Sequence, residues 1–284
     1  MKTARVNKKG ANRVRQGHLW IYKSDVLDVD AEGGSIVSVK DERGNFIGQA
    51  LFSNTSQIAL RFLTQSPEDI DRDWWRRRIA EAAGRRHIPP DTNAYRVIYS
   101  EGDLLPSLIV DRYDDVLVLQ TLSQGTEAIK SMLVEILAEQ FQPRAIIERN
   151  DARVRELEGL ELITATVYGN APEELEITQH GLRFIVAPSG GQKTGSFLDQ
   201  RENRIAARHA AQTTNTARAL DCFTFNGAFA LHLAGVCDEV IGIDISGDAV
   251  SAARRNADLI SVESGKRSLV AGDRSSVVVW ARIQ

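Results

Sequence analysis

Two aspartates and a glycine have the spacing of a nucleoside-binding loop. Asp221 ends the strand-like segment ARALDCF, and Gly227 lies in the turn before the helix-like segment GAFALHLAG. Asp244 follows about 20 residues after Asp221 and ends a second strand-like segment, EVIGIDI. A carboxylate at that place can accept hydrogen bonds from both ribose hydroxyls of an adenosine. This spacing predicts a nucleoside cofactor, and a strand-helix turn that binds nothing is the alternative.

The number of glycines in this loop separates two classes of cofactor. A dinucleotide needs the pattern G-x-G-x-x-G to bring its pyrophosphate onto the helix, and the turn has Gly227 alone. S-adenosyl-L-methionine carries no phosphate, so we predict this cofactor, with an NAD-dependent oxidoreductase as an alternative function. The loop residues predicted to bind it are Asp221, Cys222, Phe223, Asn226, Gly227, Asp244 and Ile245.

Two further segments carry charges that could bind a ligand. In LDQRENR, the arginines Arg201 and Arg204 lie at i, i+3 spacing on a predicted helix, where they could bind a carboxylate or a phosphate. A surface ion pair of Arg201 or Arg204 with Asp199 or Glu202 is the alternative. From Met1 to Ser24 there are seven basic residues and no acidic one, which favours a phosphate backbone over a merely solvated face.

The composition is that of an ordinary globular protein. The 284 residues include 35 Lys and Arg against 38 Asp and Glu, so the net charge of −3 does not by itself indicate a nucleic-acid partner. No apolar run is long enough for a membrane span or a signal peptide, and we expect a cytoplasmic protein without a membrane partner. Two cysteines argue against a disulfide framework and a structural zinc site.

The pattern of apolar residues predicts an α/β protein of three domains. Residues 1–70 read as short β segments of a small barrel or sandwich. Residues 71–188 read as a linker helix and a central α+β domain, with a helix capped by Thr126 and a hairpin turning at His180-Gly181. Residues 189–284 alternate βαβα, which indicates a parallel sheet with helices on its faces.

Three segments of the last domain carry a family resemblance. GQKTGSFLDQRENR, LDCFTFNGAFALHLAG and VIGIDISGDAVSAARRNA resemble the bacterial 23S ribosomal RNA cytosine-5 methyltransferases, which use S-adenosyl-L-methionine. HLWIYKSDV and EGDLLPSLIVDRYDDVLVLQ resemble that family's amino-terminal PUA-like barrel and its central domain, so that the resemblance covers residues 4–257. It implies a PUA-like β barrel, a central α+β domain and a partial Rossmann-like doubly wound methyltransferase fold.

The resemblance also implies roles for individual residues. It places Lys193, Thr194, Phe197, Asp199, Gln200 and Arg201 over the cofactor cleft, and Asp273 near the adenine amine. It gives the basic amino terminus ribosomal RNA as its partner. The residues expected to contact that RNA are Lys8, Lys9, Arg13, Arg15, Trp20, Lys193 and Arg204. Trp20 and Tyr22 could instead belong to the core, as alternating aromatic residues of a strand usually do.

The sequence departs from the family after Ile260. The family's cysteine nucleophile and its Asp-Pro-Pro turn would lie beyond Gln284, so we expect a truncated chain that transfers little or no methyl to C5 of a cytosine. Cys222 is a poor substitute because it lies in the cofactor loop, and Cys237 is expected to pack in the core. A non-catalytic RNA-binding module is therefore an alternative, and a homodimer is compatible with the sequence.

Overall fold

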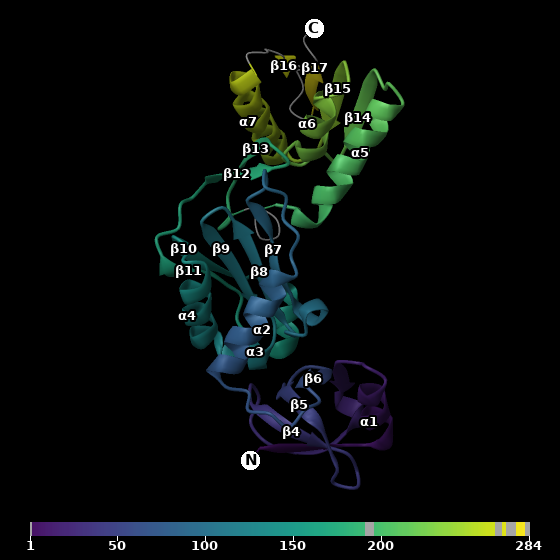
Figure 1. The fold of residues 1–284 in the computed structure, drawn as a ribbon, viewed down its shortest axis with the longest axis vertical. Helices are drawn as coiled ribbons and strands as arrows, with labels where there is room; N and C mark the ends of the chain where they lie inside the picture. The colour runs from purple at the N-terminus through teal and green to yellow at the C-terminus, as the bar shows by residue number, and fades with distance from the viewer. Residues whose placement is uncertain (1, 191–195, 265–268, 271–276, 282–284) are drawn as a thin grey trace. The chain divides into compact units, whose positions relative to one another are not determined.

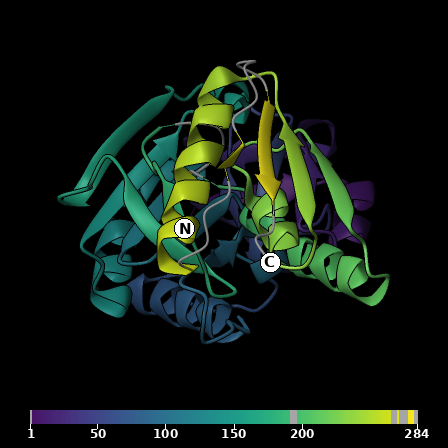
Figure 2. The same cartoon turned by 90° about the horizontal axis from the view of Figure 1, so that it is seen from above.

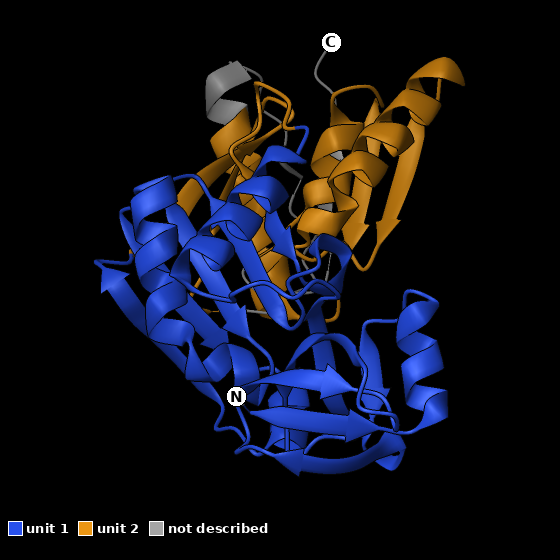
Figure 3. Cartoon of the chain, turned by 60° about the horizontal axis from the view of Figure 1, so that its bottom comes forward, with its two compact units in different colours: residues 1–87, 96–171 blue, residues 88–95, 172–284 orange. Residues whose placement is uncertain are grey.

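The computed structural model describes residues 2–190, 196–264, 269–270 and 277–281. The chain divides into two compact units, drawn in different colours in Figure 3. Unit 1 comprises residues 1–87 and 96–171, and unit 2 comprises residues 88–95 and 172–284. Within the described residues, no helix has both the length and the apolar character that crossing a lipid bilayer requires.

The amino-terminal part of unit 1 is a curled six-stranded sheet in the order β2-β6-β5-β4-β1-β3. Its strands are β1 Thr3–Val6, β2 Trp20–Tyr22, β3 Val26–Asp30, β4 Ile36–Lys40, β5 Phe46–Phe52 and β6 Ile58–Thr64. Their alternating apolar side chains, among them Ile21, Val39 and Leu60, form one buried cluster. The predicted series of short β segments is confirmed.

One element of this region was not predicted. Lys8–Arg15 forms helix α1, whose amino end is capped by the Asn7 side chain accepting a hydrogen bond from Gly10 N at 2.8 Å. The prediction of β segments alone was wrong here because only Ala11 and Val14 supply an apolar face to the helix. Basic and polar residues fill its other positions and hide the helical period.

The rest of unit 1 is a five-stranded sheet in the order β11-β10-β9-β8-β7 with helices packed against it. Its elements are β7 Ala94–Tyr99, β8 Leu108–Tyr113, β9 Val116–Thr121, β10 Ala145–Asn150, β11 Ile163–Gly169, α2 Arg72–Gly84, α3 Gln124–Ala128 and α4 Lys130–Phe141. The apolar runs of the sequence predict strands near residues 95–100, 107–112, 116–123 and 145–150 (AIIERN), and β7 to β10 confirm them to within two residues at each end, whereas β11 was not predicted. The labelled ribbon in Figure 1 traces this sheet.

One local prediction beside this sheet was wrong and another was confirmed. Ser123, not Thr126, is the cap of the helix that follows β9, because Ser123 and Thr126 bond to each other's backbone N–H in a capping box. The short helix predicted in DARVRELEGL, after β10, is confirmed as a 3₁₀ helix, Arg153–Glu158. Both Arg155 and Glu158 are buried there, so their polar contacts rather than helix propensity decide the local conformation.

The longer segment of unit 2, residues 172–284, begins with the hairpin β12 Leu175–Gln179 and β13 Leu182–Val186. His180 and Gly181 both have positive φ, 47° and 74°, so the predicted tight turn is confirmed. The hairpin packs against helix α7 Gly247–Ser264 and therefore groups with the carboxyl-terminal residues, whereas the sequence placed it in the central domain. The three domain boundaries themselves stay a prediction.

The sheet of unit 2 contains the predicted βαβ unit. β14 Arg218–Cys222 is parallel to β15 Glu239–Ile243, and the elements around them are α5 Arg201–Thr213, α6 Ala228–Ala234, β16 Leu269–Val270 and β17 Val277–Ala281. Cα pairing of Cys222 with Ile243 brings the carboxyl ends of the two strands to one edge. The two strands lie side by side in Figure 2. The turn after β14 and Asp244 consequently meet at that edge.

Candidate functional site

A cavity of about 670 Å³ lies in unit 2 at the carboxyl ends of β14 and β15. Strand β13 supplies Ile185 and Val186 to its wall, and α7 supplies Asp248, Ala249 and Ala252. The cavity is predominantly apolar, with a few charged groups at its edges, and its volume suits a small organic ligand.

The turn after β14 has an unusual backbone that Asp221 holds in place. Phe223, Phe225 and Gly227 all have positive φ, at 64°, 51° and 82°, a region that costs energy for the two phenylalanines. Asp221 accepts hydrogen bonds from Thr224 Oγ1 at 2.7 Å and from Ala230 N at 3.1 Å. Burial raises the pKa of Asp221, and the Thr224 hydrogen bond opposes that shift in part. The carboxylate thus stabilises the turn and does not line the cavity.

Asp244 connects the two loops at the edge of the cavity. Its Oδ2 accepts from Phe225 N at 2.9 Å, and its Oδ1 accepts from Ser246 N, also at 2.9 Å. Each carboxylate oxygen has a further lone pair, and Asp244 lines the cavity. The side chain can therefore accept hydrogen bonds from a bound hydroxyl group while the backbone fixes its orientation.

The predicted site residues divide into three groups. Those that line the cavity are Phe197, Gln200, Arg204, Phe223, Asn226 and Asp244. Those that the structure places outside the lining are Asp199, Arg201, Asp221, Cys222, Gly227 and Ile245. Ile245 is 97% exposed, and Arg201 forms the alternative ion pair with Glu202 at 2.8 Å. Lys193, Thr194 and Asp273 lie outside the described residues.

Arg204 lies in the interior, whereas the sequence predicted an RNA contact for it. Its side chain donates to Gln179 Oε1 at 2.6 Å and to the Phe197 carbonyl oxygen at 2.9 Å. The residue is only 3% exposed, because α5 packs beside α6 and its guanidinium lies over the Phe229 ring. Arg204 therefore links α5 to the β12-β13 hairpin within the wall of the cavity.

Several cavity residues were missed because the sequence assigned the hairpin to another domain. Glu174, just before β12, pairs with Arg255 of α7 through contacts of 2.7 and 2.9 Å at the cavity wall. Phe225 was also missed, although it lies in the predicted loop. Its ring meets Phe197 edge to face with centroids 5.1 Å apart. The run of aromatic residues in CFTFNGAF is the signal that could have identified it.

Replacing Asn256 with alanine should weaken the wall of this cavity. The fully buried Asn256 accepts from Ile185 N at 2.8 Å and donates to the Asn226 carbonyl oxygen at 2.9 Å, so it joins β13 to the turn after β14. We expect the free energy of unfolding to fall by about 1–3 kcal/mol, because both backbone groups lose their partner. Urea unfolding of Asn256→Ala measures this, with the exposed Asn203→Ala as control. Equal losses in the two variants would contradict it.

Unit 1 carries most of the basic residues that the sequence assigned to nucleic acid. Lys8, Lys9 and Arg13 line a shallow depression on α1 together with Asn12 and Gln16. The Arg13 guanidinium lies 4.8 Å from the centroid of the Tyr22 ring, which holds it near β2. Lys9 also pairs with the buried Asp25 at 3.5 Å, and Arg15 pairs with Asp41 at 2.9 Å. Of the four basic residues of α1 that the sequence assigned to RNA, three therefore line one depression: Lys8, Lys9 and Arg13.

Comparison with known proteins gives three likenesses. Residues 4–65 match the model of the PUA-like domain. Ribosomal RNA large subunit methyltransferase I of Erwinia tasmaniensis and that of Tolumonas auensis are each 38% identical to the chain, over 88% of it. The chain spans 64% of the length of these relatives.

Solved structures give the fold. A Streptococcus mutans protein assigned as a SAM-dependent methyltransferase aligns with a TM-score of 0.76 at 18% identity, over 91% of this chain and 67% of its own. A second, SMU.776, assigned as a methyltransferase and solved with SAH, aligns with a TM-score of 0.77 at 19% identity, over 91% of this chain and 66% of its own. The chain therefore has a PUA-like domain followed by a methyltransferase fold, as the sequence predicted.

Proposed function

Because its sequence relatives are ribosomal RNA large subunit methyltransferases, we propose that the chain supplies the RNA-binding and cofactor-binding parts of such an enzyme. The cofactor is S-adenosyl-L-methionine. The observation that carries the proposal is Asp244, held by two backbone N–H groups at the edge of an apolar cavity. A dinucleotide would bind poorly here, because a turn with a single glycine does not let the backbone approach and bind a pyrophosphate.

The residues of the cavity fit the parts of this cofactor. Asp244 has lone pairs left for the ribose hydroxyls, and the rings of Phe223 and Phe225 offer apolar surface for an adenine. Phe223 is 86% exposed, so a bound purine would cover surface that otherwise faces water. When bound, the cofactor supplies the sulfonium methyl group. Asp273 as the partner of the adenine amine stays a prediction.

The identity of the base that receives the methyl group is a separate proposal. We propose C5 of a cytosine, as the resemblance implies, and that reaction needs a nucleophile at C6. Cys222 is exposed and outside the cavity lining, and Cys237 is fully buried, so neither thiol reaches the described cavity. Burial also raises the pKa of Cys237, which disfavours the thiolate. We therefore expect this chain by itself to transfer little or no methyl.

Ribosomal RNA is the proposed partner of unit 1. The charges of Lys8, Lys9 and Arg13 on one short helix are suited to phosphates of an RNA backbone. A homodimer and a cytoplasmic location stay predictions.

Calorimetry with S-adenosyl-L-methionine tests the cofactor assignment. We expect binding with a micromolar Kd and no comparable binding of NAD. Asp244→Ala should weaken the cofactor by about tenfold or more, because hydrogen bonds from hydroxyls to a carboxylate are lost and the turn loosens. The exposed Asp258→Ala on α7 is the matched control. Tighter binding of NAD would support an oxidoreductase, and RNA binding without cofactor binding would support a non-catalytic RNA-binding module.

A further inference from the structure

We propose that Tyr99, together with Trp20, forms a stacking site for an unpaired RNA base on unit 1. The inference rests on the proposed function, because it concerns the RNA that the enzyme binds. Tyr99 ends strand β7, and Trp20 begins strand β2 of the amino-terminal sheet. Both side chains are exposed, Tyr99 by 57% and Trp20 by 36%, although aromatic residues at strand ends usually pack inward.

The Tyr99 ring is exposed but held in one orientation. The Arg96 guanidinium lies 5.5 Å from its centroid, and Arg96 is itself fixed by hydrogen bonds of 2.8 and 3.0 Å to the fully buried Asp111. Along its edge the ring packs on Gly102, where an added Cβ would lie 2.7 Å from Tyr99 Cδ1. A ring that neighbouring groups already restrict loses less conformational entropy when a base stacks on it.

Trp20 is tied to the same short segment. Its indole Nε1 donates to Glu101 Oε1 at 2.9 Å, and Glu101 follows Tyr99 by two positions in the 3₁₀ helix Ser100–Asp103. The bond fixes the edge of the indole and leaves part of the ring in solvent. Trp20 is therefore joined to the segment that directly follows Tyr99, although the two aromatic residues come from different sheets of unit 1.

The backbone of this segment is strained and firmly anchored. Ser100, Leu104 and Ser107 have φ of 45°, 58° and 64°, a region that side chains other than glycine adopt at a cost. The buried Asp103 holds the turn by accepting from Tyr99 N at 2.6 Å and from Arg86. Strain that the surroundings maintain in this way is typical of binding sites.

The cations of helix α1 indicate which ligand the site takes. Helix α1 directly precedes β2 and packs against it, and its exposed Lys8 and Lys9 lie on the same helix as Arg13 over Tyr22. Recognition of unpaired RNA combines bases stacked on aromatic rings with cations along the phosphates. Lysine is depleted in protein interfaces, so the exposed Lys8 and Lys9 favour RNA over a protein partner. The chemistry of this region therefore fits single-stranded RNA.

Fluorescence anisotropy with a labelled single-stranded RNA of about 12 nucleotides tests the site on the full chain. Tyr99→Ala should weaken binding by about fivefold to a hundredfold, whereas Tyr99→Phe should keep wild-type affinity because it keeps the ring face. Tyr99→Leu fills the space without an aromatic face, so its RNA affinity should be as low as that of Tyr99→Ala. The matched control is Tyr168→Ala on β11, whose side chain is 43% exposed.

The salt dependence separates stacking from phosphate binding. Tyr99→Ala should leave the slope of log affinity against log salt unchanged, while Lys8→Ala with Lys9→Ala should reduce that slope. Equal RNA affinities of wild type and Tyr99→Leu would overturn the stacking site, as would an equal loss in Tyr168→Ala. If Tyr99 contributes as expected but calorimetry finds no S-adenosyl-L-methionine binding, the enzyme assignment fails and the RNA site stands. Absence of RNA binding by the wild type would overturn both.

Discussion

Replacing Glu158 with alanine should lower the free energy of unfolding of unit 1 by about 3–5 kcal/mol. Glu158 and Arg61 form an ion pair at 2.7 Å, with side chains that are 1% and 6% exposed. Removing the carboxylate leaves the guanidinium charge buried, and an unpaired buried charge is costly because the low-dielectric interior replaces water. The result is expected in urea unfolding followed by circular dichroism.

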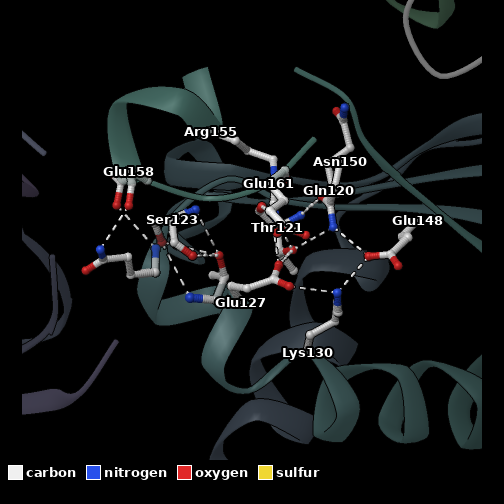
Figure 4. Close-up of polar contacts among 12 residues, drawn as sticks. Gln120, Thr121, Ser123, Glu127, Lys130, Glu148, Asn150, Arg155, Glu158 and Glu161 are labelled. Carbon is white, nitrogen blue, oxygen red and sulfur yellow. Dashed lines mark hydrogen bonds and ion pairs between the residues drawn. The ribbon is translucent and has the colours of Figure 1, made fainter. Parts of the chain in front are cut away.

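The contacts of Glu158 explain why this effect should be so large. Its Oε2 accepts from Ser53 Oγ at 2.6 Å and from Gln124 N at 3.2 Å, in addition to the Arg61 contact through Oε1. Figure 4 shows Glu158 at one side of this polar cluster. Alanine would therefore also leave two donors without their partner, each in a buried or partly buried place.

Two further variants separate the charge from the packing. The double variant Arg61→Met with Glu158→Leu should be more stable than Glu158→Ala, because no charge remains buried. Asp28→Ala, which removes the partner of Arg5 in an exposed pair, should have little effect. A loss of less than about 1 kcal/mol in Glu158→Ala would contradict the assignment of a buried, uncompensated charge.

This pair bears on the proposed RNA site because it joins the two sheets of unit 1. Arg61 lies on β6, whereas Glu158 ends the 3₁₀ helix after β10. Gln124 adds a second connection, donating to Asn54 Oδ1 at 3.0 Å and to the Glu158 carbonyl at 2.9 Å. Trp20 with Glu101 is the third. Several polar contacts therefore keep the cations of α1 and the Tyr99 ring in a fixed relation.

A second part of the polar cluster stabilises the turn after β9. Burial acts to raise the pKa of Glu127, but hydrogen bonds from Lys130, Thr121 and Arg155 together hold that pKa below its usual value. Lys130 also donates to Glu148 at 2.7 Å, as Figure 4 shows. The charges are thus shared among several partners, which is the condition under which buried ionic groups are tolerated.

The sequence predicted the elements with strong periodicity and missed those that depend on tertiary contacts. AIIERN and the His180-Gly181 turn were recognisable because runs of β-branched residues and left-handed turn residues act locally. Arg204 was not placed, because its burial depends on Gln179, which lies 25 positions earlier in the chain. For the same reason the hairpin could not be recognised as a wall of the cavity.

The sequence correctly predicted the residues at the centre of the site and was wrong about some of those at its edge. Asp244 and Asn226 follow from the βαβ pattern, which fixes the carboxyl ends of two parallel strands. Asp221 has the residue type that a ligand requires, but the turn uses its carboxylate for Thr224 and Ala230 N. A motif gives the position of a polar side chain in the sequence. Only the packed structure shows which group forms a hydrogen bond with that side chain.

Acid should destabilise unit 2 through His232. This residue of α6 is 1% exposed, and within the described part of the chain neither of its ring nitrogens has a hydrogen-bond partner. Burial first, and then the charges of Arg204 and Arg208, lower the pKa of His232 to about 3. The unfolded chain binds a proton near the usual pKa of about 6.5, so between these values it holds more protons than the folded chain.

The sign and size of the effect follow from this difference. The stability that neutral His232 provides is fully present above about pH 6.5 and is lost as the pH falls toward the folded-state pKa, at about 1.4 kcal/mol per pH unit. Unit 2 should therefore lose about 2 kcal/mol between pH 7 and pH 5. The raised pKa of Asp221 acts in the opposite direction, because a folded chain that binds this proton more tightly gains stability as the pH falls.

Thermal unfolding at several pH values, with and without a substitution, isolates this contribution. His232→Leu should remove most of the loss between pH 7 and pH 5, whereas the exposed His209→Gln on α5 should leave the profile unchanged. A wild-type profile that His232→Leu does not alter would show that another group controls it. Arg204 lines the cavity and its charge opposes protonation of His232, so a protonated His232 would repel the Arg204 guanidinium in the cavity wall. Cofactor affinity should then fall with pH in the wild type before the unit unfolds, and this early loss should be absent in His232→Leu.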